Sequence, residues 1–158
     1  MKKFFAVLLA AVMAFACVSC GSSGAKLRFV TGGESGTYYG FGSVLAQHAT
    51  NNAGISVTGV VGAGSKSNIN ELEDGNAELA FCQSDVMAYA YQGTNLFDAP
   101  VTCFSTVAAL YTEQVQIVTI DESIKTVADL AGKKVSVGAA GSGVYFNAVD
   151  ILSAYGIG

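Results

Sequence analysis

Hydrophobic and polar residues follow two periods along the chain, and each change of period marks a predicted element. The apolar run 27–30 leads into the Gly-rich loop 31–36, and Phe41, Val44, Leu45 and His48 follow at helical spacing. The same order returns late in the chain, where the β-rich run 134–138 precedes Phe146, Val149 and Leu152 at intervals of three residues, up to Gly156. Both stretches predict a strand, a loop and a helix.

Between these two units, the pattern predicts further strands and helices in alternation. The strands are predicted at 55–61, 79–82, 104–110 and 115–120, and the short helices at 68–75, 86–92 and 125–131. Asn68 with Glu71 resembles a capping box, and Ser84 is a natural N-cap with Asp85 in the first helical turn. The alternation predicts an α/β fold with a largely parallel sheet and helices on its faces.

The loop 31–36 has the character of an anion site. Glycines allow close approach to a ligand, and the first turn of a helix leaves N–H groups unpaired. The tetrad Ser35 to Tyr38 has a counterpart in Ser142 to Tyr145, so the two units could each offer a helix N-terminus to one ligand between two lobes. Neither nucleotide-loop signature is present. The alternative is that the glycines only turn the chain tightly.

The front of the chain has the pattern of an export signal. Lys2 and Lys3 precede an apolar run over 4–18, which predicts a signal peptide over 1–19. Cys20 begins a small-residue tether over 20–26 and is expected to be lipid-modified, although Cys17 stands where Leu is usual. Cleavage near Ala16 without lipidation is the alternative. We therefore expect an extracytoplasmic protein, periplasmic or on the cell surface and held by a lipid anchor.

Charge and cysteine usage narrow the classes of function. Loss of the two leader lysines changes the formal charge from −4 to −6, which argues against nucleic acid as a partner. Backbone N–H groups can still hold an anion in an acidic protein. Cys82 and Cys103 lie in apolar runs, which favours buried free thiols over a disulfide. No Cys/His set has metal-ligand spacing, and we expect neither a metal nor a cofactor.

With these motifs in place, the chain resembles the TAXI family, the solute receptors of tripartite ATP-independent periplasmic (TRAP) transporters. The resemblance is carried by TGGESGTYYGFG, GAGSKSNINELEDGNAELAFCQSD, AALYTEQVQIV and TVADLAGKKVSVGAAGSG, in this order. It implies a two-lobed periplasmic-binding-protein fold of type II. Residues 27–132 would form a nearly complete first lobe, and 133–158 would begin a second lobe that is truncated, since family members are about twice as long.

The resemblance also implies a function and a set of ligand contacts. The protein would be a non-enzymatic receptor that captures a small anionic solute, such as glutamate or a related carboxylate, and delivers it to the TRAP permease in the membrane. Asp85 would orient an α-amino group. The implied contacts are Gly36, Thr37, Tyr38, Ser65, Asn68, Gln83, Ser84, Asp85, Tyr111, Gly141, Ser142, Gly143 and Val144.

Two alternatives remain open from the sequence. A surface lipoprotein with a sensing or adhesin role is the second hypothesis. A lipoprotein hydrolase using Ser84 or Ser142 ranks last, because the single histidine, His48, is not placed with either serine as a catalytic base.

Overall fold

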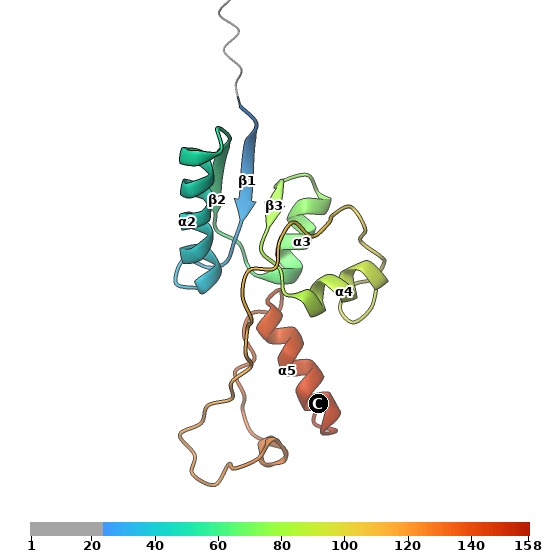
Figure 1. Ribbon diagram of the computed structural model, residues 1–158. Helices are drawn as coiled ribbons and strands as arrows, with labels where there is room; N and C mark the ends of the chain where they lie inside the picture. Colours follow the sequence, from blue (N-terminus) through green and yellow to red (C-terminus); the bar gives the residue numbers. More distant parts are fainter. Residues whose placement is uncertain (1–23) are drawn as a thin grey trace, which may run out of the picture.

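The centre of the fold is a small parallel sheet. The computed structural model describes residues 24–158, so the predicted signal peptide 1–19 and Cys20 lie outside the described residues. Strands β1 (Lys26–Val30), β2 (Ser56–Val60) and β3 (Leu79–Ala80) pair in the order β2-β1-β3, with Phe29 opposite both Gly59 and Leu79. The parallel sheet predicted from the alternating pattern is thus confirmed for these three strands (Figure 1).

Helices follow each of the three strands. The helices are α2 (Thr37–Asn52), α3 (Ser65–Glu73), α4 (Ser84–Gln92) and α5 (Gly143–Ala154), with one 3₁₀ turn, η1 (Val127–Leu130). None of the helices in the described part of the chain has the length and apolar character needed to cross a membrane. The described residues thus form a mixed α/β domain in which short loops connect strand ends to helix starts.

The first core cluster packs α2 against the sheet. Phe81 stacks between Phe29, with ring centroids 4.9 Å apart, and Tyr38, at 4.8 Å. Gly42 makes this contact possible, because a Cβ there would lie 2.5 Å from Thr31 Cγ2 and 2.9 Å from Phe81. Leu45 of the predicted apolar stripe packs against this cluster, whereas Phe41 and Val44 are 38% and 61% exposed, and the buried residues of α2 are Gly42 and Ala46.

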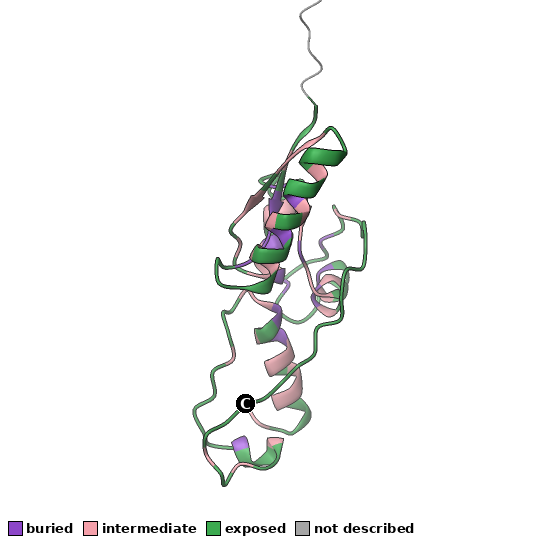
Figure 2. Cartoon of the chain, turned by 60° about the vertical axis from the view of Figure 1, so that its left-hand side comes forward, coloured by how far each residue is buried: buried purple, intermediate pink, exposed green. Residues whose placement is uncertain are grey.

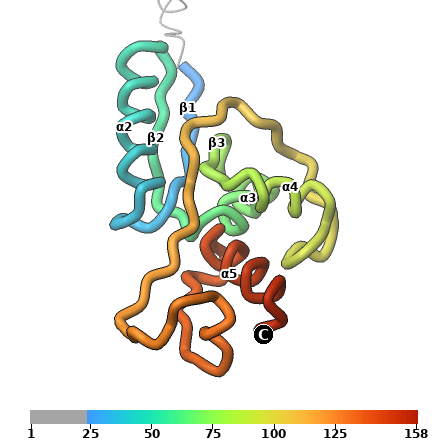
Figure 3. The backbone as a smooth tube through the Cα atoms, turned by 60° about the horizontal axis from the view of Figure 1, so that its bottom comes forward, coloured from blue at the N-terminus to red at the C-terminus, as the bar shows by residue number. Residues whose placement is uncertain are grey.

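The second core cluster joins α5 to α3 and α4. Phe146, only 2% exposed, packs among Ile69, Val86 and Ala90, with Phe97 and Val101 completing the cluster. The Tyr89 hydroxyl donates to Asp150 Oδ2 at 2.7 Å and adds a polar link from α4 to α5. Figure 3 shows α5 lying under α3 and α4, although a long stretch of chain separates them. The apolar spacing of Phe146, Val149 and Leu152 correctly predicted a helix, and Phe146 is its deeply buried member.

Three predicted strands are wrong. Residues 104–110, 115–120 and 134–138 have no strand structure. They belong to the long segment 93–142 between α4 and α5, called the excursion below, and this part of the excursion is mostly exposed (Figure 2). Val107, Val118 and Ile120 are 86%, 87% and 104% exposed. A strand needs a neighbour to pair its backbone groups, and within residues 24–158 the sheet stops at β3. The short helix predicted at 125–131 is present as η1, with a capping box formed by Thr126 and Asp129.

Two predicted caps are also wrong. Helix α3 begins at Ser65 with Gly64 as its N-cap, so Asn68 lies inside the helix and is fully buried instead of capping it. Helix α4 has Gln83 as its N-cap, and Ser84 is its first residue, while Asp85 occupies the first turn as predicted.

The state of the cysteines is partly as predicted. Cys82 and Cys103 are both free thiols. Cys82 is partly buried, but Cys103 is exposed, because it lies on the irregular excursion and not on a buried strand.

Candidate functional site

The candidate site lies at the carboxyl ends of the strands. β1 stands between β2 and β3, so the chain leaves β1 toward one side of the sheet and returns on the other side to form β3. Open α/β sheets bind ligands where the strand order reverses in this way. The loop 31–36 follows β1 and the segment Phe81 to Gln83 follows β3, so two of the sequence-predicted ligand loops meet at this point.

Four helix N-termini converge here. The Ser65 hydroxyl at the start of α3 accepts the backbone N–H of Gln83, the N-cap of α4, at 3.0 Å. The Gly141 carbonyl before α5 accepts the N–H of Lys66 at 3.0 Å. Helix α2 joins the group through Tyr38, which stacks on Phe81. Helix N-termini carry partial positive charge, so their convergence creates a region suited to an anion without any basic side chain.

The start of α2 is open to a ligand. Its N-cap, Gly36, offers no side-chain hydrogen bond, and the first turn holds no acidic residue. Gly36 and Thr37 are exposed, whereas Tyr38 is partly buried and donates from its hydroxyl to Glu113 Oε2 at 3.1 Å. Burial raises the pKa of Tyr38 strongly, an effect that the Ser65 hydroxyl opposes and the charge of Glu113 reinforces. Tyr38 therefore remains a neutral hydrogen-bond donor at physiological pH.

Lys66 does not supply a positive charge to the start of α2. Its Nζ donates to the Leu96 carbonyl at 2.5 Å and lies 5.4 Å from the centre of the Phe97 ring. The lysine nearest the converging helix starts is thus directed toward the loop after α4. An anion at this site would depend on backbone N–H groups and hydroxyls.

Asn68 holds the strand ends together. Its Nδ2 donates to the carbonyls of Thr31, at 2.5 Å, and Phe81, at 2.8 Å, and so ties the end of β1 to the end of β3. The side chain is fully buried, and among the described residues Asn68 Oδ1 has no hydrogen-bond partner. The Asn68 amide therefore bonds to the backbone of the two strand ends and fixes the position of the loops that follow β1 and β3.

A chain of amide and carboxylate groups links α4 to α5. Gln83 Nε2 donates to Asn147 Oδ1 at 3.0 Å, and Asn147 Nδ2 donates to Asp85 Oδ2 at 2.6 Å. The other oxygen of Asp85 accepts the N–H of Val86 at 2.8 Å. Any larger residue at Gly143 would displace the Gln83 side chain, because a Cβ there would overlap it. Asp85 is thus oriented by its own helix and by α5.

The loop before α5 lies against α3, and its residues differ in exposure. Ser142 caps α5 by accepting the N–H of Tyr145 at 3.3 Å, and its hydroxyl donates to the Ala139 carbonyl. Gly143 is buried, while Val144 is 61% exposed. Tyr111 is 42% exposed and makes an edge contact with Phe41, with ring centroids 5.6 Å apart.

The structure therefore brings most of the sequence-predicted residues into one neighbourhood. Contacts link Tyr38, Ser65, Gln83, Asp85 and the loop Gly141 to Gly143, whereas Val144 points outward and Asn68 points inward. Two participants were missed by the sequence analysis, Glu113 and Asn147. Glu113 lies in the quoted segment AALYTEQVQIV beside Tyr111, and this position was the available signal. Asn147 had no signal, because it lies on a helix face that only the packing of α5 defines.

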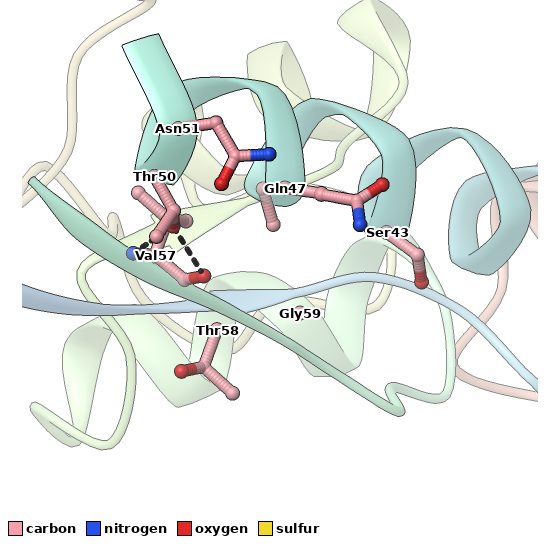
Figure 4. Close-up of a pocket in the computed structure, with 8 residues that line it drawn as sticks. Ser43, Gln47, Thr50, Asn51, Val57, Thr58 and Gly59 are labelled. Atoms are coloured by element: carbon pink, nitrogen blue, oxygen red, sulfur yellow. Dashed lines mark hydrogen bonds between the residues drawn. The ribbon is translucent and has the colours of Figure 1, made fainter. Parts of the chain in front are cut away.

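Two hollows of the surface lie beside the sheet, and one of them reaches the edge of this neighbourhood. Figure 4 shows one of about 340 Å³ between α2 and β2, lined by side chains that include Ser43, Gln47 and Asn51. In it, Thr50 Oγ1 accepts the N–H of Val57 at 2.9 Å and donates to its carbonyl at 3.2 Å, which satisfies the free edge of β2. The other hollow, of about 360 Å³, lies between Val60 and Asn76. The first hollow borders no helix start, and the second, which Gly62, Ala63 and Ser67 help to line, borders the start of α3 alone, so we place the candidate site where the several helix starts meet.

Across residues 24–158, no group of three or more His, Cys, Asp or Glu side chains is gathered closely enough to hold a metal ion.

A small parallel sheet with helix N-termini gathered at its switch point is consistent with an α/β domain like that of binding proteins. Residues 29–158 match the NMT1-like family, and the chain belongs to this family. The family is part of the periplasmic solute-binding group, so membership indicates an extracytoplasmic solute-binding role in the broad sense.

Proposed function

We propose that the protein is the solute receptor of a TRAP transporter, of the TAXI type. It would bind a small carboxylate such as glutamate or a related amino or organic acid and deliver it to the membrane permease subunits. The observation that carries the proposal is the uncapped start of α2 beside three other helix N-termini, with Tyr38 and Ser65 as hydroxyl groups at the same point. The unpaired first-turn N–H groups of α2 can bind a carboxylate, with the Ser65 hydroxyl as a further polar group beside them, whereas the Tyr38 proton is already donated to Glu113.

The proposal includes a place in the cell and a mode of attachment. The protein would be exported and held at the membrane surface through a lipid on Cys20. The basic and apolar pattern of the first residues supports this location. Metabolic labelling with a fatty acid would test it, since a Cys20→Ala variant should lose the label that the unsubstituted chain carries.

The proposed role is binding of the solute without catalysis. The Ser142 hydroxyl is engaged as the cap of α5, and His48 hydrogen-bonds with Asn52 near the end of α2, so neither is arranged as part of a nucleophile and base pair. Hydrolysis of a chromogenic ester that is lost on Ser142→Ala would favour the hydrolase alternative.

The receptor proposal is tested by ligand-dependent stability. A ligand that binds only the folded state raises the melting temperature in proportion to ln(1 + [L]/Kd). A panel of amino acids, dicarboxylates and monocarboxylates should contain at least one compound that raises the melting temperature of the purified chain and gives a saturable heat of binding. A panel that leaves the melting temperature unchanged at millimolar concentrations would count against the proposal.

A further inference from the structure

Glu113 differs from the other acidic residue of the candidate site. Both carboxylate oxygens of Asp85 already accept hydrogen bonds, one from the Val86 N–H and one from Asn147. Glu113 accepts one side-chain hydrogen bond, from the Tyr38 hydroxyl at 3.1 Å. The two ion pairs in the described part of the chain join Arg28 to Glu78 and Lys133 to Asp121, so Glu113 belongs to neither.

Two tyrosines lie beside this exposed carboxylate. Tyr38 is fixed by stacking on Phe81, and Tyr111, two residues before Glu113, rests with its edge on Phe41 at 5.6 Å. The charge of Glu113 also contributes to raising the pKa of Tyr111, after burial, so the two groups lie close together. A carboxylate beside electron-rich rings is a favourable place for an organic ammonium group, through a charge-assisted hydrogen bond and cation–π attraction.

The charge of Glu113 disfavours a ligand that carries two negative charges and no positive charge. Glu113 is a negative charge near the start of α2, and Lys66 points away toward Leu96. A plain dicarboxylate would bring two negative charges to a place that offers backbone N–H groups and no basic side chain. A ligand that carries an ammonium group as well as a carboxylate matches the two features, because a carboxylate can sit on the α2 N-terminus while the ammonium faces Glu113 and offsets one negative charge.

We propose that Glu113 is the residue that selects a protonated amine in the ligand, so that the receptor prefers amino acids over carboxylates that lack the amino group. This inference rests on the proposed receptor function. It also reassigns the amino-group role expected for Asp85, whose oxygens orient the α4 and α5 helix starts.

The test compares a ligand with its analogue that lacks only the amine. Binding of L-glutamate and of glutarate to the purified full chain is measured by calorimetry, for the unsubstituted protein, Glu113→Gln and the control Glu122→Gln. Glutamine at 113 keeps an acceptor for Tyr38 and removes the charge, so folding should be retained. Glu122 is an exposed carboxylate on the same excursion and controls for a general change of charge.

The expected result is a selective loss. Glu113→Gln should raise the Kd for L-glutamate by about tenfold, the effect of losing one charge-assisted hydrogen bond, and leave the Kd for glutarate unchanged or lower, because the variant removes a negative charge. Glu122→Gln should change neither value. Equal weakening of both ligands, or equal affinity of the unsubstituted protein for both, would overturn the role of Glu113 and leave the receptor function standing. An unsubstituted protein that binds neither ligand nor any other carboxylate would overturn both proposals.

Discussion

The attachment of α5 to α3 and α4 can be tested with one substitution, Phe146→Ala. The ring is 2% exposed and lies 6.0 Å from Tyr89 and 6.1 Å from Phe97, measured between ring centroids. Burial of a phenylalanine side chain removes about 150–250 Å² from water, and Phe→Ala in a core costs about 3–5 kcal/mol. Because α5 lies at the side of the cluster and can partly close the gap, we expect a loss near the lower limit, about 3 kcal/mol.

The control for this substitution is on the same helix. Val149 is 39% exposed, so Val149→Ala should lower the free energy of unfolding by less than about 1 kcal/mol, while introducing the same residue into α5. Urea unfolding followed by far-ultraviolet circular dichroism gives both values. Equal losses for the two variants would refute the packing of Phe146 into the cluster, and with it the position of the loop that precedes α5 at the candidate site.

Three further predictions follow from the contacts at the strand ends. Asn68→Ala should lower the free energy of unfolding by about 2–3 kcal/mol, because it leaves the Thr31 and Phe81 carbonyls without their donor. Asn70→Ala, at an exposed residue of the same helix, is the control, and equal losses for the two variants in urea titration would contradict the bridging role of Asn68. Gly143→Ala should force Gln83 off Asn147, at a cost of about 1 kcal/mol, while Gly158→Ala, in open space, should cost almost nothing. Since alanine also favours the helix, the decisive measurement is the Gln83 side-chain amide signal in NMR spectra, and an unshifted signal in Gly143→Ala would contradict the contact. Burial raises the pKa of the Cys82 thiol from 9.0 to about 12, so the unfolded chain loses this proton first and the free energy of unfolding should fall between pH 9 and pH 12. For Cys82→Ala, the free energy of unfolding should fall less steeply over this window. Iodoacetamide at pH 8 should modify exposed Cys103 well before Cys82, and the reverse order would contradict the burial of Cys82.

The parts of the fold that could be predicted from the sequence are those whose partners are close along the chain. The run 27–30 and the helix starting at Thr37 are joined by a short loop, and each has the period of its own element, so the local pattern was sufficient. The local pattern was also sufficient to predict the helices α4 and α5. Their existence was predicted correctly, while the first residue of α4 and the cap of α3 depended on backbone geometry that the residue types do not determine.

The predicted strands at 104–110 and 115–120 failed for a different reason. Alternating apolar residues indicate that a segment could pair and bury one face, but pairing requires a neighbour supplied by another part of the chain. In residues 24–158 no strand lies beside Val107 or Val118, and both remain exposed. Asn147 illustrates the same limit at the candidate site, since its link from Gln83 to Asp85 exists only after Phe146 has docked α5 on α4.

The most direct test of the account is to locate the ligand's carboxylate. An ¹⁵N-labelled chain titrated with L-glutamate and followed by amide chemical shifts reports on each backbone N–H separately. We predict that the largest saturable shifts fall on the first turn of α2, at Thr37, Tyr38 and Tyr39, where the helix has no side-chain cap. Shifts concentrated at the hollow beside β2, around Thr50 and Gly59, or the absence of saturable shifts, would contradict a receptor site at the converging helix N-termini.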